Sequence, residues 1–196
     1  KPAGTKVRML VGRGDTVYRL ELTCEKFNAR DVRSEILGNV GVIRILNFSG
    51  KVVEDYLQQL AALGFRKVDG LVLDLRASGG GLADSIPTVA CPLLTSGTTL
   101  YLETGRAGKE ETIRCPTGGG INVPAVVLTN AETVSAGEFL AVALQENGRA
   151  LVVGTKTKGY GATKRQVELP NGYTFKIITA TNLSPKRTSW LGSGVQ

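Results

Sequence analysis

A regular alternation of apolar segments with amphipathic ones, starting near residue 38, constrains the fold of this chain more than any other feature. Helical spacing is found in Val52–Leu63, Leu82–Leu94 and Val134–Gln145, whereas the strand-length apolar runs are Val40–Leu46, Gly70–Leu75, Ala125–Thr129 and Arg149–Gly154. Strands that alternate with helices indicate crossover units and a parallel sheet covered on both faces. We therefore predict an α/β fold with a mixed, mainly parallel sheet and helices on both faces. Further strands, some of them antiparallel, are expected at Glu111–Cys115, Gln166–Leu169 and Phe175–Asn182.

The first 27 residues follow a different pattern. Val7–Val11 and Thr16–Leu22 are strand-like and flank a turn at residues 12–15. Two strands cannot support a core of their own. We therefore predict that residues 1–27 are the end of a separate domain, residues 28–39 a linker and residues 40–196 the main domain. No apolar run reaches the roughly 18 residues that a membrane helix needs, so no membrane segment is expected.

The chain contains no histidine. This excludes Ser-His-Asp and Cys-His catalytic arrangements and histidine-bearing metal sites, so a hydrolase here must take its base from lysine, a carboxylate or tyrosine. The three cysteines Cys24, Cys91 and Cys115 have no CxxC spacing, and no metal or cofactor is expected. The cysteine pattern leaves disulfide pairing and compartment open.

The net charge of +7 is carried by the last quarter of the chain. Residues 149–196 contain eight lysines and arginines and one acidic residue, Glu168. These basic residues alternate with apolar ones at strand spacing and have little aromatic interleaving, which argues against nucleic-acid binding. We interpret them as a solvated sheet face that adds positive potential to a nearby site.

Ser135 opens the apolar helix that follows the buried strand Ala125–Thr129, and open α/β sheets bind ligands at the carboxyl ends of their strands. A hydroxyl at this position lies at the helix N-terminus, and the N–H of Ala136 is placed to face an anion beside it. The sequence Thr133–Gly137 has only half of a G-x-S-x-G elbow. Taken alone, such a serine is most often an ordinary helix N-cap.

A second turn strengthens the case for a catalytic site. Three consecutive glycines, Gly79–Gly81, follow the strand Gly70–Leu75. Glycines let backbone N–H groups approach a ligand oxygen closely, so Gly80 and Gly81 are candidates for an oxyanion hole. Without further support, a flexible strand-to-helix turn is the simpler interpretation. The glycines at 118–120 are interpreted as a loop only.

Three segments together resemble the carboxyl-terminal processing peptidases, also called tail-specific proteases, which are serine peptidases with a Ser-Lys dyad. The family's nucleophile pattern resembles N-x-x-[ST]-x-S-A-x-E-x-x-A, and its oxyanion turn resembles D-L-R-x-N-x-G-G-L. Ser78 replaces the asparagine of the second pattern. The matching residues are Asp74, Leu75, Arg76, Gly80, Gly81, Leu82, Asn130, Thr133, Ser135, Ala136, Glu138 and Ala141.

The resemblance implies a crotonase- or ClpP-like peptidase core, preceded by the last strands of a PDZ domain. It also implies cleavage of protein substrates near their C-termini through an acyl-enzyme on Ser135, with oxyanion donors at Gly80, Gly81 and Ala136. The implied partner is an unstructured C-terminal polypeptide, and the implied location is extracytoplasmic: periplasm, lumen or cell envelope. The oligomeric state is left open. An acyl-CoA-handling protein of the crotonase type is an alternative that the paired motifs disfavour.

One departure from the family pattern affects the predicted mechanism. The family's second lysine in G-x-K-T-x-G-K-G is the catalytic one, and Tyr160 occupies that position in Gly154–Gly161. Three outcomes remain open: Lys158 or Lys164 reaches the serine, Tyr160 takes the proton with a lysine beside it, or the chain is a pseudoprotease that binds peptides without cutting them.

Overall fold

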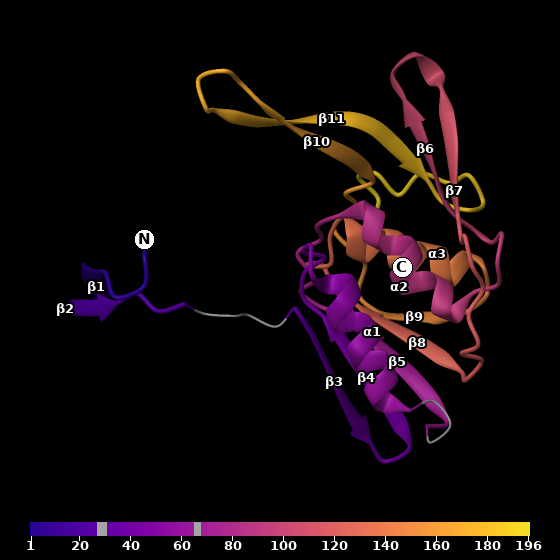
Figure 1. The fold of residues 1–196 in the computed structure, drawn as a ribbon, viewed down its shortest axis with the longest axis horizontal. Coiled ribbons are helices and arrows are strands. Elements are labelled where there is room, and N and C mark those ends of the chain that lie inside the picture. Colours follow the sequence, from indigo (N-terminus) through magenta and orange to yellow (C-terminus); the bar gives the residue numbers. More distant parts are fainter. Residues whose placement is uncertain (27–30, 65–67) are drawn as a thin grey trace. The chain divides into compact units, whose positions relative to one another are not determined.

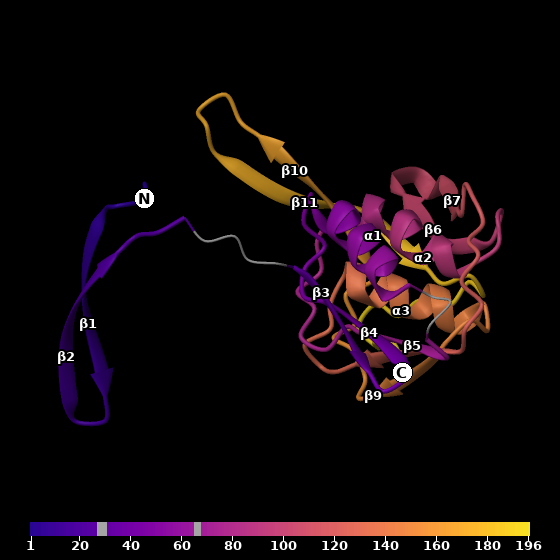
Figure 2. The ribbon, with the colours of Figure 1, turned by 60° about the horizontal axis from the view of Figure 1, so that its bottom comes forward.

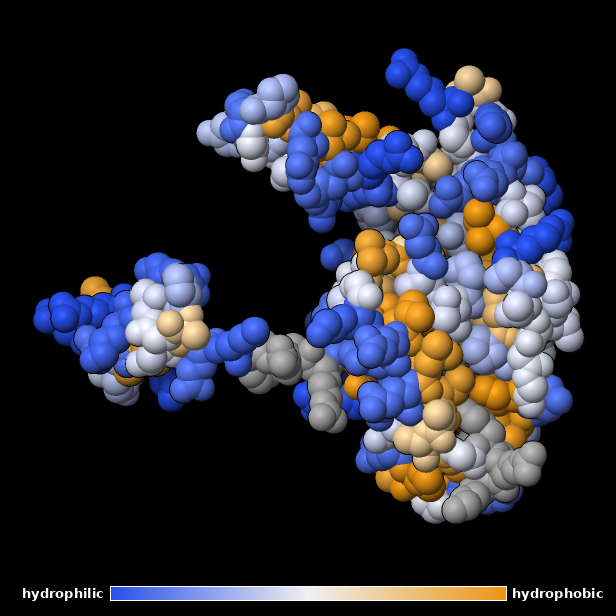
Figure 3. Space-filling model, in the orientation of Figure 1, coloured by the Kyte–Doolittle hydropathy of each residue, from blue (hydrophilic) through white to orange (hydrophobic). Residues whose placement is uncertain are grey.

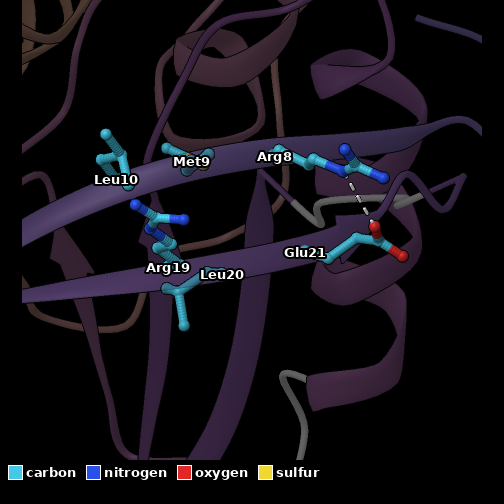
Figure 4. Close-up of a pocket in the computed structure, with 6 residues that line it drawn as sticks. All are labelled: Arg8, Met9, Leu10, Arg19, Leu20 and Glu21. Atoms are coloured by element: carbon cyan, nitrogen blue, oxygen red, sulfur yellow. Dashed lines mark hydrogen bonds and ion pairs between the residues drawn. The ribbon is translucent and has the colours of Figure 1, made fainter.

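The computed structural model describes residues 1–26, 31–64 and 68–196, and the chain divides into two units, Lys1–Arg30 and Asp31–Gln196 (Figure 1). The first unit is an antiparallel hairpin of β1 (Lys6–Arg13) and β2 (Thr16–Thr23), which confirms the two predicted strands. Exposed Met9 lies opposite Leu20, close to the ion pair of Arg8 and Glu21 (Figure 4). Because both strands are exposed, this unit has no core of its own, and its assignment to a PDZ domain stays a prediction.

The second unit is built on a five-stranded sheet in the order β3-β4-β5-β8-β9. Its strands are β3 (Val32–Leu37), β4 (Val40–Ile45), β5 (Gly70–Asp74), β8 (Ala125–Thr129) and β9 (Leu151–Gly154). Only the β3–β4 pair is antiparallel, as expected for a mixed, mainly parallel sheet. β3 occupies half of the segment predicted as a linker (residues 28–39), and the second unit begins at Asp31.

The helices cover one face of this sheet, so the prediction of helices on both faces was wrong. In Figures 1 and 2, α1 (Val52–Leu63), α2 (Ile86–Ala90) and α3 (Ala136–Glu146) lie on the same side of the sheet. The parallel strands follow one another in chain order, and right-handed crossovers in one direction place every connection on the same face. The other face stays open: Leu151 is 72% exposed, whereas Ile43 and Val127 on the helix side are fully buried.

A four-stranded antiparallel sheet, in the order β10-β11-β6-β7, completes the unit. It comprises β6 (Thr99–Gly105), β7 (Glu110–Arg114), β10 (Ala162–Glu168) and β11 (Thr174–Leu183), and the β10–β11 hairpin projects from the body (Figure 1). The helix predicted over Leu82–Leu94 is split into α2 and the 3₁₀ turns Ala83–Ser85 and Cys91–Leu93; a third such turn is Arg106–Gly108. Pro92 lies in the last turn of this region, and a proline cannot donate a helical hydrogen bond.

Aromatic packing, a disulfide and side-chain hydrogen bonds connect the two sheets and the helices. Phe139 of α3 packs edge-to-face against both Tyr101 and Trp190. A disulfide joins Cys91 to Cys115, and the Arg149 guanidinium donates to three backbone carbonyls between residues 93 and 123. Within the described ranges, no helix is long and apolar enough to cross a membrane.

Candidate active site

Ser135 has a backbone conformation that few non-glycine residues adopt. Its φ of 55° and ψ of −120° place it in a sparsely populated region at the turn between β8 and α3. Such strain persists only where surrounding structure imposes it, and it concentrates at functional sites. A strained serine on a strand-to-helix turn is the geometry of a nucleophile elbow, although Thr133 replaces the first glycine of that motif.

The glycine turn predicted to serve Ser135 does lie against it. Gly80 has a φ of 78°, and a Cβ added there would lie 2.7 Å from the Ser135 Cβ and 3.3 Å from its Oγ. Phe48 holds the turn from behind: its N–H donates to the Gly80 carbonyl, and its own carbonyl accepts from the Leu82 N–H, both at 2.8 Å. In the described part of the chain, the N–H groups of Gly80, Gly81 and Ala136 donate to no protein acceptor, so they remain available to a ligand.

Two polar side chains join the serine turn to the glycine turn. The Asn130 Oδ1 accepts a hydrogen bond from the Ala77 N–H at 2.9 Å. The buried Thr133 hydroxyl donates to the Leu75 carbonyl at 2.8 Å and accepts from the Asn130 N–H at 3.0 Å. These contacts explain why an asparagine and a threonine or serine stand at these two motif positions.

Glu138 links Ser135 to the loop that carries Tyr160. Its fully buried carboxylate accepts four hydrogen bonds. The Ser135 and Tyr160 N–H groups, each at 2.8 Å, donate to Oε2, while the Thr157 hydroxyl and the Gly159 N–H, each at 2.6 Å, donate to Oε1. The Ser135 and Tyr160 amide nitrogens therefore lie at most twice 2.8 Å apart.

The three candidate bases differ in where their side chains lie. The Tyr160 hydroxyl is buried and has no hydrogen-bond partner in the described structure, so it is not bonded to Ser135. The Lys164 Nζ lies 4.4 Å from the centre of the Tyr160 ring, over its face. The Lys158 side chain is exposed, although its backbone N–H donates to the Thr133 carbonyl at 3.0 Å. Tyr160 and Lys164 are thus brought together, and no candidate base contacts the serine hydroxyl by a hydrogen bond.

A second hydroxyl in the site is also without a partner. Ser78, which stands where the related motif has asparagine, is fully buried, and its Oγ forms no hydrogen bond in the described part of the structure. A Cβ added to Gly137 would lie 3.2 Å from this oxygen, so Ser78 packs directly on the first turn of α3. Buried hydroxyls without partners cost free energy and are uncommon in folded proteins.

Asp74 and Arg76, the charged residues before the glycine turn, form a bidentate ion pair. Both contacts from the guanidinium to the carboxylate measure 2.9 Å, and the Arg76 N–H donates to the same carboxylate at 3.0 Å. Burial alone would raise the pKa of Asp74, but the hydrogen bonds and charge of Arg76, with the nearby Arg44, outweigh it and hold the pKa below its usual value. The carboxylate therefore stays ionised at neutral pH and fixes the start of the turn.

The sequence motifs located these residues but did not reveal what Glu138 contacts. Its donors at 157–160 are about twenty residues further along the chain, and only the fold brings them to the first turn of α3. The one signal in the sequence was a carboxylate three residues after Ser135, at the N3 position of the helix, which is typical of a capping box.

The fold is that of a known family of peptidases. Residues 39–196 match the model of Peptidase family S41, and the chain belongs to that family, which confirms the resemblance drawn from the motifs. It is 35% identical over 148 residues to a carboxyl-terminal-processing protease of Synechocystis sp., covering 76% of this chain and 34% of the relative.

Further similarities agree with this assignment. The carboxy-terminal processing protease CtpA of Bacillus subtilis is 28% identical over 180 residues, covering 90% of this chain and 38% of the relative. The solved structure of a photosystem II D1 C-terminal processing protease superposes with a TM-score of 0.77 at 27% identity, covering 99% of this chain and 55% of that one. The chain thus spans less than half the length of these curated relatives.

Proposed function

We propose that this chain is the core of a serine peptidase that cleaves polypeptides near their C-termini through an acyl-enzyme on Ser135. The observation that carries the proposal is the strained Ser135 backbone held against Gly80. The names of the relatives, which are C-terminal processing proteases, support the substrate class. An unstructured C-terminal segment is the proposed substrate, because a folded segment keeps its backbone carbonyls away from a nucleophile on another protein.

In the proposed reaction, the Ser135 Oγ attacks the carbonyl carbon of the scissile bond while its proton passes to the base. The C–N bond then breaks, and the base returns the proton to the leaving amine. Water attacks the resulting ester by the same route and releases the new C-terminus. The free N–H groups of Gly80, Gly81 and Ala136 would stabilise the oxyanion in both steps.

We assign the base to Tyr160, with Lys164 as its neighbour. The backbone of Tyr160 is tied to that of Ser135 through Glu138, and its hydroxyl has no competing partner in the described structure. The Lys164 ammonium beside the ring favours the phenolate, which is the form of Tyr160 that can accept the proton of Ser135 and become the neutral phenol. A rotation of the Tyr160 side chain toward Ser135 completes the relay.

A fluorophosphonate probe, which reacts with activated serines, tests this proposal. Labelling of the wild-type chain that Ser135→Ala abolishes is the expected result. Tyr160→Phe should slow labelling about 100-fold or more, because a base contributes roughly 10²–10⁴ in rate. Lys164→Ala should slow it less, and Lys158→Ala should leave it unchanged.

Tyr160→Lys serves as the matched gain-of-function variant, since it restores the amine of the family motif on the same backbone. Labelling by this variant alone, with none by wild type between pH 6 and 10, would contradict the proposed base and the proposed peptidase activity of the wild-type chain.

We also propose an extracytoplasmic location. The disulfide between Cys91 and Cys115 supports it, because disulfides persist in oxidising compartments. This pairing was not deducible from the cysteine spacing. Mass spectrometry of the chain isolated with free thiols blocked should find these two cysteines linked and Cys24 modified.

A further inference from the structure

An unpaired strand edge begins at the candidate active site. In the part of the chain that the structure describes, β10 pairs with β11 on one side and with no strand on the other. It starts at Ala162, two residues after Tyr160, whose amide shares the Glu138 Oε2 with the Ser135 amide. A chain lying along this edge would therefore lead to the serine.

The hairpin behind this edge has two chemically different faces. Arg165 lies opposite Ile177 and Val167 opposite Phe175, so one face is mainly apolar, and it ends in Tyr173, which is 71% exposed. The space-filling view shows this apolar patch on the projecting hairpin, bordered by hydrophilic residues (Figure 3). The other face carries Lys164 and Lys176.

The charge of the hairpin favours an acidic partner. From Ala162 to Leu183 its charged residues are three basic ones, Lys164, Arg165 and Lys176, and one acidic one, Glu168. Within the described residues these three cations make no ion pair, so their charge is uncompensated. Basic residues on an edge strand repel a second copy of the same strand but attract a chain with carboxylates.

We propose that the free edge of β10 binds the substrate as an added strand, and that it prefers extended segments in which acidic and apolar side chains alternate. This inference rests on the proposed peptidase function and adds a docking surface and a sequence preference to it. Strand addition supplies main-chain hydrogen bonds, which give affinity, while the alternating side chains give specificity.

Binding of a fluorescein-labelled peptide, Asp-Val-Glu-Val-Asp-Val-Ala-Ala, tests the proposal. Fluorescence anisotropy is measured with the Ser135→Ala chain, which cannot cleave it. Two analogues are compared: one with N-methylated valines, which removes alternate backbone donors, and one with lysine at each acidic position. We expect each change to weaken binding at least tenfold, and we expect the parent peptide to bind less tightly at high salt.

A pair of charge reversals locates the surface. Lys176→Glu lies on the basic face of the hairpin and should weaken binding of the parent peptide about tenfold, whereas Lys109→Glu, an exposed residue beside β7 at the opposite edge of the same sheet, should leave it unchanged. Thermal unfolding checks that both variants remain folded.

The outcomes separate this inference from the proposed function. Equal binding of the N-methylated peptide, equal effects of the two charge reversals, or no binding of the parent peptide at 1 mM would overturn the strand-addition proposal, even if Ser135 reacts with the probe. Selective binding without any probe labelling would uphold the docking surface and overturn the peptidase.

Discussion

At the scale of single residues, the candidate site depends on main-chain geometry more than on side chains. Gly80 approaches Ser135 so closely that no side chain fits between them, and its φ of 78° disfavours any other residue. The three N–H groups proposed to bind the oxyanion also belong to the backbone.

Gly80→Ala therefore tests whether the site needs this close approach of the backbone, because it adds a single methyl group. The added methyl group would lie 2.7 Å from the Ser135 Cβ and 2.8 Å from the Val134 carbonyl oxygen, so one of the two turns must move. We expect fluorophosphonate labelling to fall about 100-fold, as it does when an oxyanion donor is lost. Gly120→Ala is the control, because open space surrounds Gly120 and its φ is not positive. Equal labelling of both variants would show that the approach of Gly80 to the serine does not matter.

At the scale of elements, a covalent bond holds the segment that follows the glycine turn. The disulfide joins the 3₁₀ turn after α2 to the end of β7, and both cysteines are buried. The same region packs on Gly119, whose N–H donates to the Leu94 carbonyl at 2.9 Å. The loop at 118–120 thus packs against the backbone at residues 92–94, in line with its interpretation as a structural loop.

Replacement of both buried cysteines by serine should lower the free energy of unfolding by about 3 kcal/mol, because the bond closes a loop of 24 residues in the unfolded chain. Urea denaturation monitored by circular dichroism measures this loss. Cys24→Ser, which changes the free cysteine of the first unit, should cost almost nothing. A double variant as stable as wild type would show that the packing around Arg149 suffices without the cross-link.

At the scale of the whole molecule, the two units differ in what stabilises them. The buried apolar core lies within residues 32–195, whereas β1 and β2 expose their apolar side chains. The site also draws all its described residues from the second unit.

Deletion of residues 1–30 should consequently leave the melting temperature within about 2 °C of the wild-type value. The rate of Ser135 labelling should stay within about twofold, since every described residue of the site belongs to the second unit. Differential scanning calorimetry and the fluorophosphonate assay measure the two quantities. A fall in melting temperature of 5 °C or more would mean that the hairpin contributes to the core.

Sequence patterns were sufficient to predict the parts of the site that depend on neighbouring parallel strands. Ser135 and Gly80 follow β8 and β5, which are adjacent in the sheet, so both turns emerge at the same edge. Periodicity does not contain the strand order, and for this reason the single helical layer was missed. β6 was missed because its apolar run, residues 100–102, is short and does not alternate with polar residues. This segment forms a strand by pairing with β7 and β11. The three donors to Glu138 at residues 157–160 were likewise beyond reach, because they meet this carboxylate only in the folded chain.

The anchoring of position 160 through its amide has a consequence for its side chain. Every residue except proline offers the same N–H to the Glu138 carboxylate, so the loop keeps its course whatever side chain stands there. Under the base proposed above, the side chain that accepts the proton can therefore change by a single substitution while the backbone of the loop stays as it is.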